Sequence, residues 1–334
     1  MRNDGVICRR AIIPPFSNQT DNTMIKKTLY FENPAYLSMK NSQLVIKLPE
    51  VVSNDSLPES FKQESIKTIP IEDIGIVILD NKQITITHGL LEALLNNNAA
   101  VITCGSNRMP IGLHLPLEGN TTQSERTQAQ IDASLPLKKQ LWQQTVQAKI
   151  TNQAYVLDTC RGEVVKNMLA WVRDVKSGDS DNLEGRAAAY YWANMFRDID
   201  GFRRGREGIP PNNLLNYGYA VLRAVIARSL VSSGLFPALG IHHHNRYNAY
   251  CLADDVMEPY RPFVDKLVVE IIDSGRDFND LSKEIKMKLL GIPVLDVIIN
   301  GQRSPLMVAA QQTTASLARC YLGEIRKIAY PSFE

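Results

Sequence analysis

Short segments in which apolar and polar residues alternate occupy the chain from Met24 to about residue 115. They are rich in Ile, Val and Thr, and turn-forming residues separate them, which is typical of half-buried strands. The predicted strands are Ile25–Phe31, Gln43–Leu48, Ile66–Ile69, Ile74–Leu79, Ile84–Thr87, Ala99–Thr103 and Ile111–Leu115. A single short helix is predicted over Gly89–Leu95. The pattern therefore predicts a β-strand-rich, sandwich-like domain over residues 24–115.

After residue 115 the apolar residues recur at helical spacing, and strand signals nearly vanish. Helices are predicted at about 121–133, 136–154, 160–176, 182–197, 212–233, 253–273, 277–289 and 308–328. Loops are expected at 177–181, 198–211 and 234–250. We therefore expect an α+β protein in which the N-terminal β-sandwich-like domain precedes a larger all-α domain, residues 116–334. The polar, Asn-rich residues 1–23 are expected to form a flexible N-terminal extension.

The composition narrows the class of protein only slightly. Of 334 residues, 44% are hydrophobic and 22% are charged, as in ordinary globular proteins. The net charge of +2 neither requires nor excludes binding of nucleic acid, so this function has to be judged from local basic clusters. No segment offers the ~20 apolar residues that cross a bilayer, and the N-terminus lacks the apolar core of a signal peptide. We expect a cytoplasmic protein with no membrane partner. Scattered cysteines without metal-ligand spacing indicate free thiols in a reducing compartment: Cys8, Cys104, Cys160, Cys251 and Cys320.

Three consecutive histidines, residues 242–244, lie in the expected loop 234–250, although the chain has only five. Such a cluster is more often solvated surface than a ligand set. Downstream, Asp255 and Glu258 would share one face of a helical turn. Taken alone they are better explained as helix-start acids, which the helix dipole favours. One imidazole such as His243 with carboxylate oxygens nevertheless suits Mn²⁺ or Mg²⁺ with open water positions, rather than a closed zinc site.

Glu184 is a third candidate, about sixty residues upstream. Asp181 precedes it by three positions, so a capping box would explain Glu184 by structure alone. Against this, Gly185 costs about 1 kcal/mol of helix propensity relative to Ala. The small residues 187–189 would also let a ligand or another backbone approach closely. Spacing alone does not join Glu184 to the other two residues, and both interpretations stay open.

Arginines supply the candidates for DNA contacts. Arg203, Arg204 and Arg206 surround a glycine in the expected loop 198–211, which suits a mobile phosphate clamp because arginine binds phosphate through two hydrogen bonds. A solvated charged loop explains them equally well. Arg223 lies on an otherwise apolar helix, where it either contacts DNA or pairs with an acid. Arg246 follows the histidine cluster and is the last of these candidates.

Together these motifs resemble the CRISPR-associated integrase and endonuclease Cas1, in the form found in type II systems beside Cas9. The resemblance is carried by the run Gly240 to Asp265, by Glu184-Gly185 and by the segment Asn213 to Tyr219. It covers about Met24 to Pro331, and the β-rich part matches more loosely.

The resemblance implies that Glu184, His243 and Glu258 are catalytic and bind Mg²⁺ or Mn²⁺. Asp255 is held as a reserve ligand, because many relatives have aspartate where this chain has Glu258. The family's fold has an N-terminal β-domain followed by a larger helical catalytic domain, as the periodicity predicts here. The β-domain is expected to serve dimerisation and partner docking.

The resemblance also implies a reaction and its partners. The enzyme would insert short foreign DNA duplexes into a CRISPR array, as 3′-hydroxyl ends attack phosphodiesters of the repeat. Two homodimers would flank a Cas2 dimer and hold double-stranded DNA, with other type II proteins including Cas9 as possible partners. A non-catalytic DNA-binding scaffold and an unrelated metallophosphoesterase are the alternatives that the residues leave open.

Overall fold

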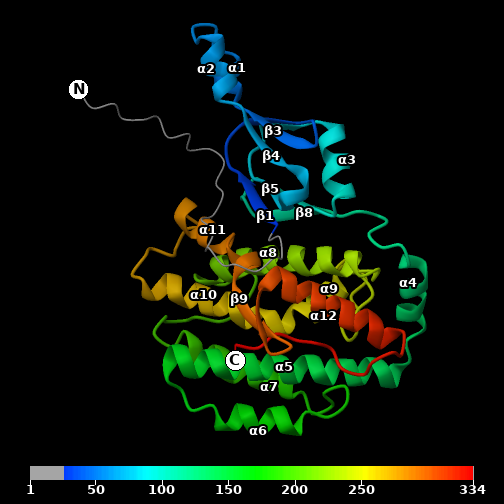
Figure 1. Ribbon diagram of the computed structural model, residues 1–334. Coiled ribbons are helices and arrows are strands. Elements are labelled where there is room, and N and C mark those ends of the chain that lie inside the picture. Colours follow the sequence, from blue (N-terminus) through cyan, green and yellow to red (C-terminus); the bar gives the residue numbers. More distant parts are fainter. Residues whose placement is uncertain (1–25, 334) are drawn as a thin grey trace. The chain divides into compact units, whose positions relative to one another are not determined.

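The computed structural model describes residues 26–333 (Figure 1). The chain divides into two compact units, the first ending at Pro116 and the second beginning at Leu117. Residues 1–23, for which an extension is predicted, lie outside the described residues.

The first unit is built on two four-stranded sheets. In one sheet the strand order is β1-β5-β7-β8, with β1, β5 and β7 parallel to one another and β8 antiparallel. In the other the order is β4-β3-β2-β6, with β6 parallel to β2 and the remaining pairs antiparallel. The strands are β1 (Lys27–Phe31), β2 (Ala35–Lys40), β3 (Gln43–Lys47), β4 (Lys67–Pro70), β5 (Ile74–Leu79), β6 (Ile84–Ile86), β7 (Ala100–Cys104) and β8 (Pro110–His114).

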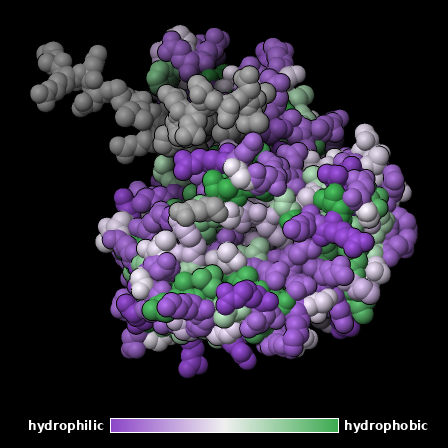
Figure 2. Space-filling model, turned by 60° about the horizontal axis from the view of Figure 1, so that its bottom comes forward, coloured by the Kyte–Doolittle hydropathy of each residue, from purple (hydrophilic) through white to green (hydrophobic). Residues whose placement is uncertain are grey.

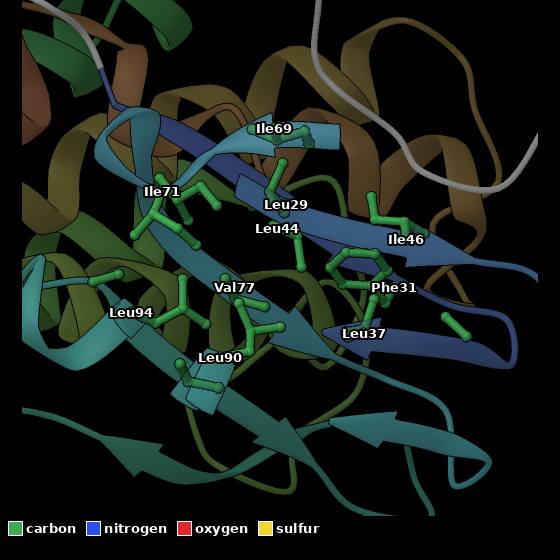
Figure 3. Packing of buried hydrophobic residues seen from close by; sticks show 14 residues of the cluster. Leu29, Phe31, Leu37, Leu44, Ile46, Ile69, Ile71, Val77, Leu90 and Leu94 are labelled. Carbon is green, nitrogen blue, oxygen red and sulfur yellow. The ribbon is translucent and has the colours of Figure 1, made fainter. Parts of the chain in front are cut away.

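Both sheets and one helix share a single hydrophobic core (Figure 3). Phe31 and Val77 come from the first sheet and Leu44 from the second, and each is almost fully buried. Helix α3 (His88–Asn96) adds Leu90 and Leu94, which have no exposed surface. Alternating residues thus point from the two sheets into one core, as the periodicity predicts.

The structure contains elements of this unit that the sequence pattern did not predict. Strand β2 has no β-branched residue, so its composition is weak for a strand; it forms because β3 and β6 pair with its two edges. Helices α1 (Pro49–Val52) and α2 (Glu59–Glu64) bury no residue, so they leave no amphipathic pattern.

The second unit is mainly helical. Helix α8 is buried along most of its length and contacts α9, α10, α11 and α12, whereas α5 contacts α6, α7, α10 and the 3₁₀ turn η2. The helices are α4 (Gln123–Asp132), α5 (Leu135–Arg161), α6 (Lys166–Asp174), α7 (Leu183–Met195), α8 (Asn212–Ser232), α9 (Cys251–Met257), α10 (Arg261–Asp273), α11 (Lys283–Leu289) and α12 (Leu306–Tyr321), with 3₁₀ turns η1 (Ile71–Asp73, in the first unit), η2 (Glu258–Tyr260) and η3 (Ile292–Val294).

Most predicted helices are present, but several have other limits than predicted; α6 and α11, for example, begin at Lys166 and Lys283 rather than near 160 and 277. Helix α5 continues to Arg161 and ends at Gly162, whose φ of +65° is left-handed, so the prediction of a break near 154 was wrong. The predicted helix 253–273 is interrupted by η2, because Pro259 has no N–H to continue the ladder. Helix α12 ends at Tyr321, before Gly323 at φ +77°.

A β-hairpin corrects the prediction that the second unit is entirely α-helical. Strands β9 (Asp296–Ile299) and β10 (Gln302–Pro305) pair antiparallel across Asn300 and Gly301. Both turn residues have positive φ, 51° and 76°, which is the geometry of the two-residue turn that Asn-Gly favours. The α+β fold class itself is confirmed.

None of the helices among residues 26–333 is both long and apolar enough to cross a membrane. On the face seen in Figure 2 most of the surface is hydrophilic, and hydrophobic residues form small separate groups.

Three helices meet at one buried carboxyl group. Asp265 of α10 accepts a hydrogen bond from Tyr219 of α8 at 2.5 Å and another from Tyr191 of α7 at 3.0 Å. Burial raises the pKa of Asp265 to about 7, although both hydrogen bonds and nearby arginines act in the opposite direction. The folded protein therefore holds a proton here that an unfolded chain releases near pH 4.

We predict that wild-type stability falls between about pH 4 and pH 7 relative to an Asp265→Asn variant. Because the pKa of Asp265 is higher in the folded protein, its contribution to stability is fully present below the pKa of the unfolded chain. That contribution is lost as the pH rises to the folded pKa of about 7. Above pH 7 the difference in free energy of unfolding should stay constant. Urea denaturation from pH 4 to 8.5 measures it, with the exposed Asp280→Asn as control. A difference that does not change with pH would contradict the buried proton.

Candidate active site

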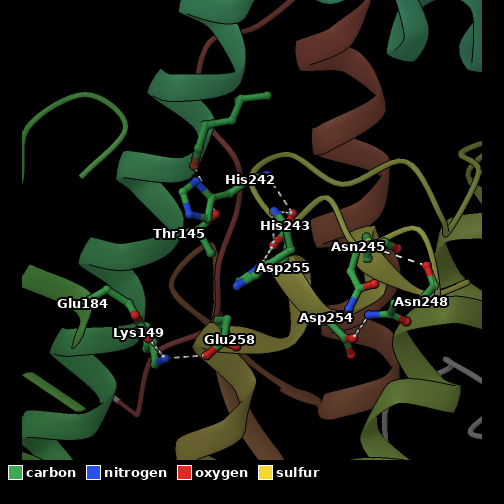
Figure 4. A network of polar contacts seen from close by, with 12 residues as sticks. Thr145, Lys149, Glu184, His242, His243, Asn245, Asn248, Asp254, Asp255 and Glu258 are labelled. Atoms are coloured by element: carbon green, nitrogen blue, oxygen red, sulfur yellow. Dashed lines mark hydrogen bonds and ion pairs between the residues drawn. The ribbon is translucent and has the colours of Figure 1, made fainter. Parts of the chain in front are cut away.

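Helix α5 places one charged side chain on an otherwise buried face. Leu141, Val146 and Ile150 on this helix are almost fully buried, and so is Lys149, whose side chain is 8% exposed. A lysine is rarely buried without a partner. The ammonium group lies between two carboxylates, those of Glu184 and Glu258 (Figure 4).

Glu184 is presented by the first turn of α7. The N-cap residue is Asn182, whose side chain accepts from the N–H of Gly185. The side chain of Asp179 accepts from the backbone N–H groups of Leu183 and Glu184, both at 2.9 Å. These acceptors satisfy the helix N-terminus. The side chain of Glu184 instead pairs with Lys149, while Asp181 pairs with Lys176, so the capping-box interpretation was wrong.

Glu258 opens the 3₁₀ turn between α9 and α10, and its side chain is 7% exposed. Oε1 lies 3.0 Å from the Arg261 guanidinium, and Oε2 lies 2.6 Å from Lys149 Nζ. Burial acts to raise the pKa of this carboxyl, but Arg261 and Lys149 outweigh it and lower the pKa. The Asn152 amide donates to the carbonyl of Pro259 at 2.8 Å, which fixes the backbone directly after Glu258.

His243 is oriented by Asp255, which is completely buried at the middle of α9. The carboxylate accepts from the backbone N–H of His242 at 2.9 Å and pairs with Nδ1 of the His243 ring. Because a carboxylate can only accept a hydrogen bond, the Nδ1 that faces Asp255 carries the hydrogen. Nε2 has no hydrogen-bond partner among residues 26–333. A carboxylate behind a histidine in this way fixes the ring and its tautomer.

The electrostatic surroundings place His243 in the same site as both glutamates. The hydrogen bond to Asp255 raises the pKa of the His243 ring against the effect of burial, and the charges of Glu258 and Glu184 raise it further. Trp142 of α5 stacks on His242 with ring centroids 4.4 Å apart and meets His243 edge-on at 5.5 Å. These rings limit how far the imidazoles can turn.

Lys149 occupies the point at which the carboxylates converge. Burial would lower its pKa, but attraction to Glu258 and Glu184 prevails and raises it, so the ammonium stays charged. Among residues 26–333, no three His, Cys, Asp or Glu side chains are already arranged as metal ligands. Two carboxylates around one cation, with the free Nε2 of His243 nearby, are still a donor set that fits Mg²⁺ or Mn²⁺ once the ammonium withdraws.

The predicted DNA-binding arginines differ in whether their side chains are exposed or already bonded within the protein. Arg203, Arg206 and Arg246 are exposed. Arg204 donates to Asn212 Oδ1 at 2.9 Å, and its guanidinium lies 5.1 Å from the centroid of a tyrosine ring inside the unit. Arg223 pairs with Asp254 at 2.7 Å, the acid-paired alternative considered above.

Two residues of the site were not predicted from the sequence. Lys149 and Trp142 lie seven residues apart, hence on one face of α5. A lysine within the apolar stripe of a helix was the signal that could have identified this site, because such a lysine needs a buried acid as its partner.

We predict that Gly240→Ala disrupts the site. An added Cβ would lie 2.3 Å from the carbonyl oxygen of His243 and 2.9 Å from Asp255, so the turn that closes His243 onto Asp255 would have to open. The free energy of unfolding should fall by about 1–3 kcal/mol. Denaturant unfolding measures this, with Gly205→Ala as the control, since its nearest neighbour is 4.0 Å away. Equal losses in the two variants would contradict the prediction.

Comparisons with known proteins agree with this fold. A casposase bound to integration product has the same fold, with a TM-score of 0.70 and 22% identity over 90% of this chain and 91% of that chain. A Cas6-RT-Cas1–Cas2 complex matches with a TM-score of 0.68 and 18% identity over 93% of this chain and 36% of the other.

Sequence comparison is more specific than the fold. The CRISPR-associated endonuclease Cas1 of Neisseria meningitidis serogroup C (strain 8013) is 34% identical over 88% of this chain and 91% of its own length. The family described as CRISPR associated protein Cas1 matches residues 29–289. The chain therefore belongs to the Cas1 family of CRISPR-associated proteins.

Proposed function

We propose that this Cas1 protein is a divalent-metal-dependent DNA endonuclease and integrase of CRISPR adaptation. The observation that carries the proposal is the convergence of Glu184 and Glu258 on a single cation position beside the free Nε2 of His243. The relative from Neisseria is named an endonuclease, and the casposase of like fold was solved with an integration product.

The residues of the site have separate roles in this proposal. Glu184, Glu258 and His243 Nε2 would hold Mg²⁺ or Mn²⁺. A bound divalent ion lowers the pKa of an attacking hydroxyl and neutralises charge on the phosphoryl oxygens. Asp255 keeps the His243 ring in place with Nδ1 as donor, and so acts as a positioning residue rather than the ligand in reserve. Arg261 keeps the Glu258 carboxylate ionised.

Partners follow from the same proposal. The chain would form homodimers that flank a Cas2 dimer, since a neighbour of like fold is a Cas1–Cas2 complex. Double-stranded DNA would serve as donor and target, held through its phosphates by exposed Arg203 and Arg206. A type II system with Cas9, and action in the bacterial cytoplasm, complete the proposal.

We predict that Glu184→Gln, Glu258→Gln and His243→Ala each abolish strand transfer. Positioning partners behind a metal ligand cost about 10–100-fold, so loss of a ligand should exceed 100-fold. The assay mixes the protein, its Cas2 partner, a short duplex and a supercoiled repeat-bearing plasmid with Mn²⁺ or Mg²⁺, and counts joined products. His244→Ala is the control, because this exposed ring lies outside the site.

Each result of that assay separates the proposal from its alternatives. Full activity in Glu184→Gln or His243→Ala would refute the assigned site. Wild-type protein that binds DNA without strand transfer would indicate a scaffold. Turnover of a small phosphoester but not of DNA would indicate a metallophosphoesterase.

Lys149 allows a test of the metal site that does not depend on activity. Without divalent ions, Lys149→Met should lower the free energy of unfolding by a few kcal/mol, because buried Glu258 loses its ammonium partner. Mn²⁺ should then bind and stabilise this variant more than the wild type, since no ammonium competes for the carboxylates. Denaturant unfolding in the presence of EDTA or of Mn²⁺ measures the stability of each variant. Calorimetric titration with Mn²⁺ measures the affinity.

The matched control is Lys139→Met, an exposed lysine of the same helix. If Mn²⁺ affinity stays at the wild-type value in Lys149→Met, the metal does not bind where the ammonium lies.

A further inference from the structure

Residues 328–333 lie outside any helix or strand, and side chains of the helical unit hold their peptide groups. The N–H of Ile328 donates to the Gln144 side chain of α5 at 2.9 Å. The N–H of Ala329 donates to the Ser316 hydroxyl of α12, also at 2.9 Å. Peptide groups outside regular structure need such partners when they leave water. The path of the 328–333 segment is therefore determined by the helices that it crosses.

Asn152 of α5 joins this segment to the turn that carries Glu258. The residue is 2% exposed, and its side-chain amide donates to the carbonyl of Pro259 at 2.8 Å and to that of Pro331 at 2.9 Å. Both hydrogens of the amide are used in this way, because the amide nitrogen carries two. The residue next to Glu258 and the 328–333 segment are therefore held together against α5.

A second bridge joins the same two stretches of chain through α12. The hydroxyl of Tyr260, the last residue of η2, lies 2.6 Å from the Thr313 hydroxyl, and Thr313 donates to the carbonyl of Ala329 at 2.6 Å. Because the one hydrogen of Thr313 goes to Ala329, Tyr260 is the donor in the first bond. Tyr260 and Thr313 have no exposed surface. Two consecutive residues after Glu258 are thus bonded to one segment through two different helices.

These bridges lie directly beside the proposed metal position. Lys149 precedes Asn152 by three positions on α5, so both side chains lie on one face of the helix. If the Lys149 ammonium withdraws, its ion pair no longer holds the Glu258 carboxylate toward α5. Arg261 and the bonds to the turn then have to keep the carboxylate in place, because ions such as Mg²⁺ demand near-ideal ligand geometry.

We propose that Asn152 and Thr313 are positioning residues for Glu258, and that they hold its turn against the 328–333 segment at the distance from α5 that a divalent ion requires. This inference rests on the proposed function in that Glu258 binds the metal. Neither residue contacts the metal or the DNA. Their contribution is to the affinity for the ion, through the backbone of the turn.

Calorimetric titration of the full-length protein with Mn²⁺ tests the inference without DNA. Asn152→Ala removes the first bridge and should weaken Mn²⁺ binding about 10–100-fold, the range for partners behind a metal ligand. Thr313→Val removes the second bridge while nearly keeping the shape of the side chain, and it should weaken Mn²⁺ binding in the same direction. The test therefore does not depend on whether Asn152→Ala folds.

The matched control is Thr314→Val, at the next position of α12. Thr314 also has no exposed surface, and it donates to the carbonyl of Ser229 on α8 at 3.0 Å, away from the turn. This variant loses a buried hydroxyl as Thr313→Val does, so the denaturant midpoint should fall in both. Only Thr313→Val should bind Mn²⁺ more weakly, whereas Thr314→Val should stay within about twofold of the wild-type affinity.

Wild-type Mn²⁺ affinity in both Asn152→Ala and Thr313→Val would overturn the inference, and so would equal weakening in Thr313→Val and Thr314→Val. The proposed function is judged separately, by strand transfer with the wild-type protein. Weaker Mn²⁺ binding in the two bridge variants, beside a wild-type protein that joins no DNA, would support the inference and count against the proposed function alone.

Discussion

The ion pairs around Lys149 are the constraint on which the site depends. Glu184 comes from α7 and Glu258 from the turn after α9, and their like charges would repel if nothing lay between them. A buried ammonium on α5 offsets this repulsion and links three segments that are far apart in the sequence. Arg261 and Lys149 together lower the pKa of Glu258, so that this buried carboxyl remains ionised. The proposed replacement of the ammonium by a divalent ion would therefore keep a cation between the two carboxylates.

This arrangement explains why the helical unit is organised about α5 and α8. Helix α5 supplies the cation and Trp142, and α8 provides the packing surface behind α9 and α10. The buried junction at Asp265 joins α7, α8 and α10, so the helix that presents Glu184 is fixed to the helix that follows Glu258. Side chains that do no chemistry thus determine where the chemical groups lie.

Periodicity was enough to predict the α+β fold class and most helices, because burial imposes a period on any element that packs. It failed for β2, whose composition is neutral and whose pairing is determined by neighbouring strands. It also failed for the hairpin at Asn300-Gly301, although that dipeptide is a strong local signal for a two-residue turn. The break at Glu258 follows from Pro259, which the sequence displays, but the choice of a 3₁₀ turn follows from tertiary contacts.

The site was only partly predictable, because some of its residues are brought together only by the fold. His243, Asp255 and Glu258 lie close together in the sequence, and chemistry alone suggested a metal. Glu184 needed the family resemblance, since spacing could not exclude the capping box that the bonds of Asp179 and Asn182 rule out. Arg204 seemed as available as Arg203 in sequence, yet its guanidinium is held by Asn212 inside the unit.

The adjacent acids Asp254 and Asp255 have an evolutionary consequence. They fasten the two ends of one loop, so residues 244–250 form an insert between fixed anchors. Substitutions within the insert leave both anchors in place, so the histidine keeps its position. Substitutions at either anchor release one end of the loop. Diversity among related enzymes should accordingly collect between the anchors, and the acids themselves should tolerate little change.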